Sequence, residues 1–314
     1  MDEDTTSSPS NANYSIWKAV AREDDIAAWL TIMMSLPFMH GFVNERWRKC
    51  IDTMLEKKFG IRKVHMLRII GILEADFNTA LKILYGKRLM EMAEKAGLHE
   101  EQWGSRSNRT STDPALMFMM TVEYGRYMKA TIGLFNADQG SCFDRMYPSL
   151  SNALANVHGM DEKANECRAK TLESMEHHCK TGLGVSKRFY TNKPGKPKKL
   201  GEVQGKGDVP CLWALTSSVL LFAMNILYAG VRLPSAGGKA DITATNFGFV
   251  DDIRTLAAAF ACGIAATQRV LDTLTVAAQK WANVMDVTAA YTAFHKCLIQ
   301  ILAWKIVKSS YVID

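Results

Sequence analysis

Residues 246–256 constrain this chain more than any other stretch, because apolar residues lead into two adjacent carboxylates and then resume. Phe247 and Phe249 precede Asp251 and Asp252, and Ile253 follows them. Apolar strands interrupted by a short polar turn predict a β-hairpin whose tip presents both aspartates. Neighbouring carboxylates repel each other unless solvent or cations neutralise them, and Mg²⁺ does so through oxygen ligands.

An adjacent pair of aspartates is more often a solvated turn than a metal site. Asp24 and Asp25 illustrate this, because Arg22 and Glu23 precede them and make the segment a charged surface. The pair at 251–252 differs in its apolar flanks. A functional interpretation of that pair therefore depends on the motifs that accompany it.

Composition indicates a soluble globular protein. The 314 residues allow one large or two modest domains, and 48% are apolar, 22% are charged and the net charge is +6. Seven cysteines without a CxxC pair predict reduced thiols in an intracellular compartment, with nucleus and cytoplasm left open. His177, His178 and Cys179 are adjacent, but sequence neighbours rarely share one ion and no partner set follows, so the sequence predicts no zinc site.

One apolar segment is long enough to cross a bilayer. Residues 211–231 carry no charge, but they include Thr216, Ser217, Ser218 and Asn225. These polar residues favour a buried core helix, and we expect no membrane partner. Residues 1–13 are acidic and rich in Ser and Asn, which predicts disorder and no signal peptide.

Periodicity predicts mainly helices with one buried strand near the middle. Apolar residues at helical spacing predict helices over residues 16–56 (interrupted at Pro37 and Gly41), 75–97, 113–128, 148–180 and 257–284. Residues 131–135 are typical of a buried strand, and Asp138 lies just beyond it. A carboxylate at a strand end is held rigidly yet meets solvent, although Asp138 could equally cap a helix.

Three segments combine cations with turn residues. Residues 57–70 alternate basic and apolar residues around Gly60, which predicts a hairpin whose tip could grip a triphosphate or simply be solvated. Residues 191–199 form a cationic loop broken by proline and glycine, and residues 102–109 form a second polar loop. The nucleic-acid contacts predicted in these two loops are Gln102, Arg106, Arg109, Lys196, Lys198 and Lys199.

Residues 201–210 form a glycine-rich loop before the long apolar helix. Glycines at 201, 205 and 207 let a backbone approach a ligand closely. The loop is not a Walker loop, because the GK[ST] ending is missing, and no G-x-G-x-x-G is present.

Taken in order, these pieces resemble the reverse transcriptase domain, closest to the kind in non-LTR retrotransposons and group II introns, over roughly residues 55–300. Residues 138–144 fit D-x-x-x-[AC]-F-D, residues 201–210 fit the spacing G-x-x-Q-G-x-x-x-x-P, and residues 249–252 fit an aromatic-x-D-D hairpin. The resemblance extends to a fingers segment usually written R-P-I at 67–70 (with Ile69 where proline is usual), a Q-x-G element at Gln102 and Gly104, and a later palm lysine at Lys296.

The resemblance implies an α/β (α+β) fold of the palm-and-fingers type, with an antiparallel palm sheet backed by helices. It divides the chain into a disordered tail (1–15), an N-terminal helical extension (16–56), fingers and palm (57–300) and a truncated C-terminal segment (301–314). Only 18 residues follow Lys296. We therefore expect the thumb to be largely absent and synthesis by the isolated chain to be weak.

The implied activity is that of an RNA-directed DNA polymerase, which adds dNTPs to a DNA primer 3′-hydroxyl on an RNA template. Two Mg²⁺ ions about 3.5–4 Å apart, which Mn²⁺ can replace, would stabilise the attacking hydroxyl and the leaving pyrophosphate. By resemblance, Asp138 and Asp251 would bridge both ions and Asp252 would be more peripheral. Lys296 could protonate pyrophosphate as a general acid or be only a surface lysine.

The implied nucleotide contacts come from several motifs. Phe143 would pack against the incoming sugar and exclude a 2′-hydroxyl, while Gln204 and Gly205 would line the nucleotide and template side. The cations that would hold the triphosphate are Lys58 or Lys63, and Arg68.

Two alternatives stay open. A viral RNA-dependent RNA polymerase shares the palm and its aspartates, but it usually has an acid where this chain has Phe143 and a Ser-Gly pair where it has Gln204 and Gly205. The chain could also be an inactive or truncated retroelement fragment that binds nucleic acid without turnover. The sequence does not determine template specificity, priming mode or oligomeric state.

Overall fold

A computed structural model of the chain describes residues 8–12, 14–61, 63, 66–140, 142–191, 201–234, 241–288, 290–307 and 310–313. They form two compact units, each described by itself below. Unit 1 comprises Met1–Ala96 and Met146–Leu212, and unit 2 comprises Gly97–Arg145 and Trp213–Asp314. The chain therefore passes between the units three times.

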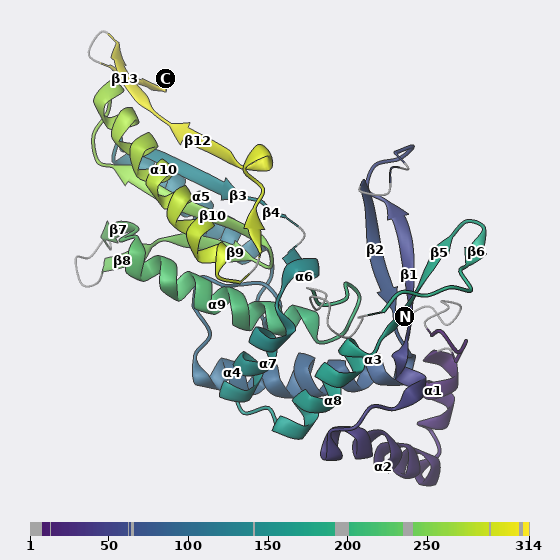
Figure 1. The fold of residues 1–314 in the computed structure, drawn as a ribbon. Helices are drawn as coiled ribbons and strands as arrows, with labels where there is room; N and C mark the ends of the chain where they lie inside the picture. Colours follow the sequence, from purple (N-terminus) through teal and green to yellow (C-terminus); the bar gives the residue numbers. More distant parts are fainter. Residues whose placement is uncertain are drawn as a thin grey trace. The chain divides into compact units, whose positions relative to one another are not determined.

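Unit 1 is built on a four-stranded sheet in the order β2-β1-β5-β6 (Figure 1). β1 pairs antiparallel with β2 and parallel with β5, which joins strands more than a hundred positions apart in sequence. The strands are β1 (Lys49–Glu56), β2 (Leu67–Ile72), β5 (Glu176–Thr181) and β6 (Gly184–Val185).

The other regular elements described in unit 1 are helices, and aromatic residues form part of its core. The Trp47 and Phe77 rings stack at 4.8 Å, and Phe38 packs against both. The helices are α1 (Tyr14–Val20), α2 (Asp24–His40), the 3₁₀ turn η1 (Glu45–Arg48), α3 (Ala75–Leu81), the π-helical η3 (Lys82–Leu89), α4 (Met90–Ala96), α7 (Pro148–Val157) and α8 (Glu162–Glu173).

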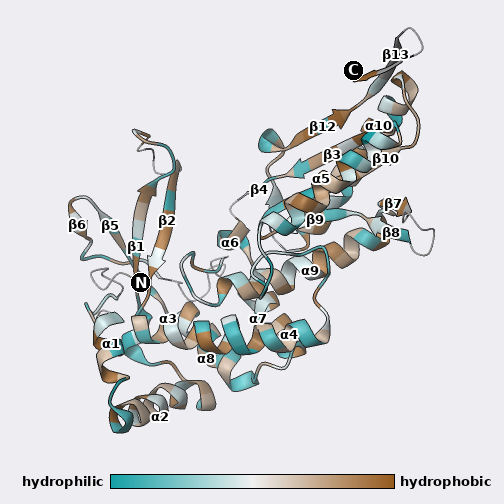
Figure 2. Ribbon diagram, turned by 180° about the vertical axis from the view of Figure 1, so that it is seen from behind, coloured by the Kyte–Doolittle hydropathy of each residue, from teal (hydrophilic) through white to brown (hydrophobic). Residues whose placement is uncertain are grey.

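Unit 2 contains an antiparallel sheet in the order β12-β3-β10-β9. Its strands are β3 (Thr131–Ala137), β9 (Asn246–Phe249), β10 (Asp252–Ala259) and β12 (Leu298–Leu302). The leucines and isoleucines of β12 give it the brown colour of apolar residues in Figure 2.

Helices cover both faces of this sheet. On one face α10 (Ile264–Asp286) lies so close that a Cβ on Gly133 would come within 2.4 Å of Val270. On the other face, Ile132 and Leu134 alternate with Gly133 and form a cluster with Phe247 and Leu256, against which α5 (Thr112–Tyr127) packs through partly buried side chains.

The remaining elements of unit 2 are short, apart from a shared helix. They are β4 (Gln139–Gly140), α6 (Cys142–Arg145), β7 (Val231–Pro234), β8 (Asp241–Ala244), β11 (Tyr291–Thr292), the 3₁₀ turn η4 (Phe294–Lys296), β13 (Trp304–Val307) and β14 (Ser310–Ile313). Helix α9 (Val209–Leu227) begins in unit 1 and continues in unit 2. Within the described ranges it alone has the length and apolar composition to cross a membrane, and 67% of its most apolar window is buried, as in a core helix.

Three predicted helices were wrong at their ends. Residues 49–56, 176–180 and 257–259 are strands, not helices. In β1 the two fully buried residues, Cys50 and Asp52, are two positions apart, which is the spacing of a strand. Because Asp52 is polar, the sequence does not show this alternation as a pattern of apolar residues. Residues 255–257 are buried on both faces of β10, so the sequence shows no alternation of apolar and polar residues there. Pairing with β3 determines the strand conformation in spite of the helix propensity of its alanines.

Candidate active site

The register of the two central strands of unit 2 places two of the three predicted catalytic carboxylates opposite each other. β3 and β10 pair with Ala137 opposite Ile253, so the next positions, Asp138 and Asp252, fall opposite each other at the same end of the sheet. Adjacent strands lie about 5 Å apart. Asp251 directly precedes Asp252 in the turn between β9 and β10.

Asp251 also acts electrostatically on the segment that follows Asp138. Burial raises the pKa of the Cys142 thiol in α6, and the charges of Asp251 and Asp144 raise it further. The Asp251 carboxylate is therefore close enough to Cys142 to act on its charge. All three predicted carboxylates belong to residues at one end of this sheet, although more than a hundred positions separate Asp138 from the other two.

Lys296 reaches the same place. Its Nζ lies 3.1 Å from Asp138 Oδ1, and the two side chains are 53% and 42% exposed. The backbone enforces this contact, because β11 pairs with β4 and the Ala293 N–H donates to the Asp138 carbonyl at 2.9 Å. Gly140 permits the pairing, since a Cβ there would come within 2.1 Å of the Tyr291 ring.

The hairpin tip is held in a strained conformation. Val250 has a φ of +57°, the left-handed region that a β-branched residue rarely adopts. Its carbonyl accepts hydrogen bonds from Trp213 Nε1 at 2.7 Å and Gln102 Nε2 at 3.4 Å. A Cβ on Gly104 would come within 2.2 Å of the Val250 backbone nitrogen. Strain of this kind persists only where the surroundings fix the backbone.

The loop that carries Gln102 and Gly104 supports the catalytic hairpin. The Trp103 N–H donates to the Gly248 carbonyl at 2.8 Å, and the Gly248 N–H donates to the Glu101 carbonyl at 2.9 Å. The Gln102 side chain is fully buried: it donates to Ser217 Oγ at 2.6 Å and accepts from the Gly104 N–H at 2.9 Å. The Q-x-G element therefore positions residues 248–250.

Burial corrects the predicted role of two loop residues. Gln102 is 0% exposed and Arg106 is 8% exposed, and Arg106 Nη1 donates to the carbonyls of His99 and Gln102. Side chains committed in this way cannot reach nucleic acid, so the predicted direct contacts do not fit. Arg109 is half-buried, with its guanidinium 4.8 Å from the Trp103 ring and a hydrogen bond to the Glu100 carbonyl.

Phe143, the predicted sugar-packing residue, lies in the same unit as the carboxylates. It is half-buried on α6, and its ring meets Trp213 edge-to-face at 6.3 Å. Trp213 therefore contacts both Phe143 and the carbonyl of Val250. Sequence reasoning missed this tryptophan, because in an apolar helix it looks like any core residue.

The predicted triphosphate cations belong to unit 1. Lys58, Lys63 and Arg68 are exposed on β2 and on the connection between β1 and β2. These strands pair antiparallel, but the first of them, Lys49–Glu56, lies before the predicted hairpin of residues 57–70. The loop residues Gln204 and Gly205 lie in the same unit. Lys196, Lys198 and Lys199 lie outside the described residues.

The loop carrying Gln204 is fastened to β2 and α3. The Gly71 N–H donates to the Gln204 carbonyl at 2.8 Å, and the Gly207 N–H donates to Asn78 Oδ1 at 2.7 Å. Gly205 has a φ of +111°, and a Cβ there would come within 2.8 Å of the Gly71 carbonyl oxygen. Glycine is thus needed at 205 for both its conformation and its close packing.

A buried ion cluster holds the same loop from the other side. Arg168 on α8 contacts Glu202 and Asp208 at 2.5 Å each, Lys206 contacts Glu202 at 2.5 Å, and all four side chains are fully buried. Burial opposes ionisation of Glu202, but the charges of Arg168 and Lys206 outweigh it and lower the pKa of Glu202 to about 2. No sequence pattern predicted this cluster, because Arg168 is remote from the loop in the chain.

The carboxylates at 138, 251 and 252 fit divalent cations. Each supplies hard oxygen ligands of the kind that Mg²⁺ prefers, and none is fully buried. The ammonium of Lys296 on Asp138 shows that positive charge is already favourable there. Figure 1 locates the site where β3 and β10 end near β4.

Comparison with known proteins gives structural neighbours only. No protein-family model matches the chain, and no curated protein matches it in sequence. Telomerase from Candida tropicalis, solved with a TWJ fragment of telomeric RNA, matches with a TM-score of 0.52 and 10% identity over 92% of this chain. The fold is that of a reverse-transcriptase-like polymerase.

Two further telomerase structures match less well. Apo telomerase from Candida tropicalis, truncated from its C-terminal domain, has a TM-score of 0.49 and 16% identity over 96% of this chain. Telomerase from Candida albicans with a TWJ fragment of telomeric RNA has a TM-score of 0.47 and 10% identity over 92% of this chain. The chain spans 58% of the Candida tropicalis apo telomerase, 45% of the Candida tropicalis RNA complex and 46% of the Candida albicans RNA complex. The match with a TM-score of 0.52, together with the antiparallel sheet and its covering helices, confirms the α/β fold expected from the motifs.

Proposed function

We propose that this chain is the RNA-directed DNA polymerase domain of a retroelement, which adds dNTPs to a primer 3′-hydroxyl on an RNA template. The observation that carries the proposal is the strand register, which sets Asp138 opposite Asp252 at the ends of β3 and β10, with Asp251 directly before Asp252. The reverse-transcriptase-like fold and the order of the sequence motifs support the same activity. The retroelement assignment rests on the motifs alone.

The proposed chemistry assigns a task to each group. Asp138, Asp251 and Asp252 would hold two Mg²⁺ ions, for which Mn²⁺ can substitute. Bound ions would supply Lewis-acid stabilisation of the attacking hydroxyl and the leaving pyrophosphate. Lys296 starts 3.1 Å from Asp138 and would be released by cation binding to donate a proton to pyrophosphate.

Nucleotide selection in this proposal falls to aromatic and basic residues. Phe143 would pack against the sugar of the incoming nucleotide and exclude a 2′-hydroxyl, with Trp213 fixing its ring. Gln204 and Gly205 would line the nucleotide and template side. The cations proposed for the triphosphate are Lys58, Lys63 and Arg68.

An RNA template is the proposed partner. The telomerase neighbour from Candida tropicalis with a TM-score of 0.52 is itself a complex with a fragment of telomeric RNA. A protein binds an RNA–DNA hybrid mainly through its backbone and shape, which suits exposed cations scattered over hairpins. The cationic residues 193–199 would add to this contact.

The deciding experiment is extension of a DNA primer on an RNA template with Mg²⁺ or Mn²⁺. We expect dNTP incorporation, and a fall of at least about a hundredfold in Asp138→Asn and Asp251→Asn, because these changes remove charge that the ions require. Asp25→Asn is a matched control, since it alters an adjacent aspartate pair in the exposed start of α2.

Three outcomes would contradict the proposal. Preference for NTPs over dNTPs would favour an RNA-dependent RNA polymerase. Hybrid binding without any incorporation would favour an inactive fragment. If Asp251→Asn still extended primers at the unaltered rate, the carboxylates would not take part in the reaction.

A further inference from the structure

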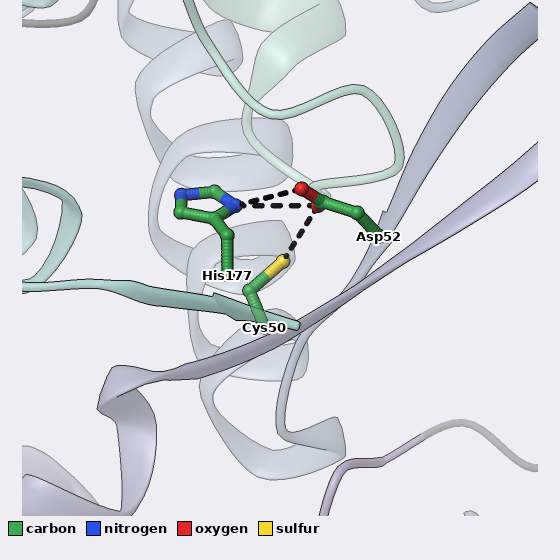
Figure 3. Close-up of side chains that lie close together, drawn as sticks. All are labelled: Cys50, Asp52 and His177. Atoms are coloured by element: carbon green, nitrogen blue, oxygen red, sulfur yellow. Dashed lines mark hydrogen bonds and ion pairs between the residues drawn. The ribbon is translucent and has the colours of Figure 1, made fainter. Parts of the chain in front are cut away.

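Unit 1 contains a cluster of side chains of the types that bind metal ions, and these belong to a different unit from the carboxylates of unit 2. Cys50 and Asp52 on β1 and His177 on β5 turn toward one another, and their ligand atoms all lie within 4.8 Å of each other (Figure 3). Cys50 is 0% and Asp52 2% exposed, and the His177 side chain is 14% exposed. We propose that these three residues bind one zinc ion.

The strand register brings the three residues together. β1 and β5 run parallel with Cys50 opposite His177, so both side chains share a face of the sheet. Asp52 lies two residues after Cys50 and therefore points to the same face. The neighbouring His178 points to the other face, which is why the adjacent histidines and cysteine in the sequence did not predict the site.

The distances from Asp52 to the other two donor atoms are close to those between ligands of a tetrahedral zinc ion. His177 Nδ1 lies 3.2 and 3.1 Å from the two carboxylate oxygens of Asp52, and Cys50 Sγ lies 3.5 Å from Asp52 Oδ1. Bonds of about 2.0–2.3 Å at tetrahedral angles separate neighbouring ligand atoms by about 3.3–3.8 Å. Small side-chain rotations would therefore centre an ion among the three.

The donor types select zinc over magnesium. One sulfur, one imidazole nitrogen and one carboxylate oxygen suit a borderline-soft ion, whereas Mg²⁺ prefers oxygen ligands alone. Binding would release the Cys50 thiol proton, and the His177 ring would carry its remaining proton on Nε2. With Cys50 as thiolate, Cys50 and Asp52 together would neutralise the charge of a divalent ion.

Tyr190 holds the Asp52 carboxylate in place. Reciprocal backbone hydrogen bonds join Tyr190 to His177, the two rings stack at 5.0 Å, and the Tyr190 hydroxyl donates to Asp52 Oδ2. Burial opposes ionisation of Asp52, but hydrogen bonds from His177 and Tyr190 outweigh it and lower its pKa. Three protein ligands would leave the fourth position of a tetrahedral zinc ion to a water molecule.

An ion here would brace the loop that carries Gln204. A Cβ on Gly71 would come within 3.1 Å of Cys50 Sγ and 2.0 Å of Val203 Cγ1, so these three residues are immediate neighbours. Gly71 also donates its N–H to the Gln204 carbonyl. Zinc would tie β1 to β5 beside this contact.

The test is zinc binding by the full chain after exhaustive removal of metal with a chelator. We expect one zinc per chain, and a loss of affinity of about a hundredfold or more in Cys50→Ser and His177→Gln. Cys211→Ser and His178→Gln are matched controls, because Cys211 is another buried thiol of unit 1 and His178 faces away from the cluster. Both controls should bind zinc as tightly as the unaltered chain.

Two further measurements guard against misfolded variants. Zinc should raise the melting temperature of the unaltered chain by about 5 °C or more. Co²⁺ in place of zinc should give a thiolate-to-cobalt absorption band, displaced by zinc. Asp251→Asn should keep both responses, which separates this site from the proposed polymerase site.

The proposal would be overturned if the unaltered chain binds zinc no more tightly than His177→Gln, or if its cobalt form lacks the thiolate band. The cluster would then be a hydrogen-bonded group centred on Asp52. Either result leaves the proposed polymerase activity unaffected.

Discussion

At the scale of single residues, the hairpin tip depends on Gly104, whose lack of a side chain lets the loop 102–104 pack against Val250. Val250 keeps a left-handed backbone because Trp213 and Gln102 donate hydrogen bonds to its carbonyl and Gly104 packs closely against its backbone nitrogen. Backbone strain at such a position costs about 1–3 kcal/mol and must be offset by its surroundings. The placement of Asp251 therefore depends on residues that never touch a substrate.

Gly104→Ala should displace this tip. Its new Cβ would meet the Val250 backbone nitrogen at 2.2 Å, and backbone cannot move aside as a flexible side chain can. We expect a loss of about 1–3 kcal/mol in the free energy of unfolding, measured by urea denaturation, and a marked fall in primer extension. Gly182→Ala is the control, since no heavy atom lies within 4 Å of its Cβ position.

Trp213→Phe separates packing from hydrogen bonding at the same tip. Phenylalanine keeps an aromatic ring near Phe143 but removes the Nε1 donor that lies 2.7 Å from the Val250 carbonyl. We expect a loss of about 0.5–1.5 kcal/mol in the free energy of unfolding and slower dNTP incorporation at saturating substrate. Extension by the variant at the unaltered rate would show that the tip does not need this donor.

At the scale of elements, α8 and the glycine-rich loop are joined by buried charge. Breaking such a cluster by removing one partner is costly, because the remaining charges lose their compensation. The pKa of Glu202 is lowered to about 2 from an ordinary value of 4.5. Its contribution to stability is therefore present above about pH 4.5 and is lost as the pH falls toward 2.

Glu202→Gln tests this acid dependence. The unaltered chain should be more stable than the variant at pH 6, and the difference in unfolding free energy should shrink as the pH falls from about 4.5 to about 2. Urea denaturation of both proteins across this range measures it. Glu162→Gln, an exposed change at the start of α8, is the control. A gap between the chains that does not vary with pH would contradict the assignment.

Sequence reasoning worked best where local pattern and motif order agreed. It placed Asp138 beyond a buried strand and Asp251 at a hairpin tip, because apolar runs that end in carboxylates are visible without partners. It also predicted a hairpin at residues 57–70, but only its second strand matches, because the first strand of the observed hairpin is β1 (Lys49–Glu56), which was predicted as helix.

The misses share a physical cause: each depends on a partner distant in sequence. Gln102 and Arg106 looked like exposed polar residues, and only tertiary contacts show that they are buried against Ser217 and the His99 carbonyl. Arg168 carries no local signal for Glu202, and Cys50 carries none for His177. Secondary structure failed likewise in β1 and β5, where parallel pairing across more than a hundred residues decides the conformation.

At the scale of the whole molecule, the chain builds two units from interleaved segments. Each unit has its own sheet and its own core, with Trp47 and Phe77 in unit 1 and Leu134 and Leu256 in unit 2. The proposed carboxylate site lies wholly in unit 2, and the proposed zinc site and the Gln204 loop lie wholly in unit 1. Separate cores predict that damage to one unit is largely confined to it.

Hydrogen exchange on two reciprocal variants measures this independence. Arg168→Leu removes the centre of the buried ion cluster and should cost unit 1 about 3–5 kcal/mol, which raises amide exchange in β1 and β5 while β3 and β10 stay protected. Leu274→Ala opens a cavity where α10 covers Gly133 and should cost unit 2 about 2–5 kcal/mol with the opposite pattern. If either change loosened both sheets equally, the units would unfold as one body, because the three chain passages would then couple them more strongly than each core stabilises itself.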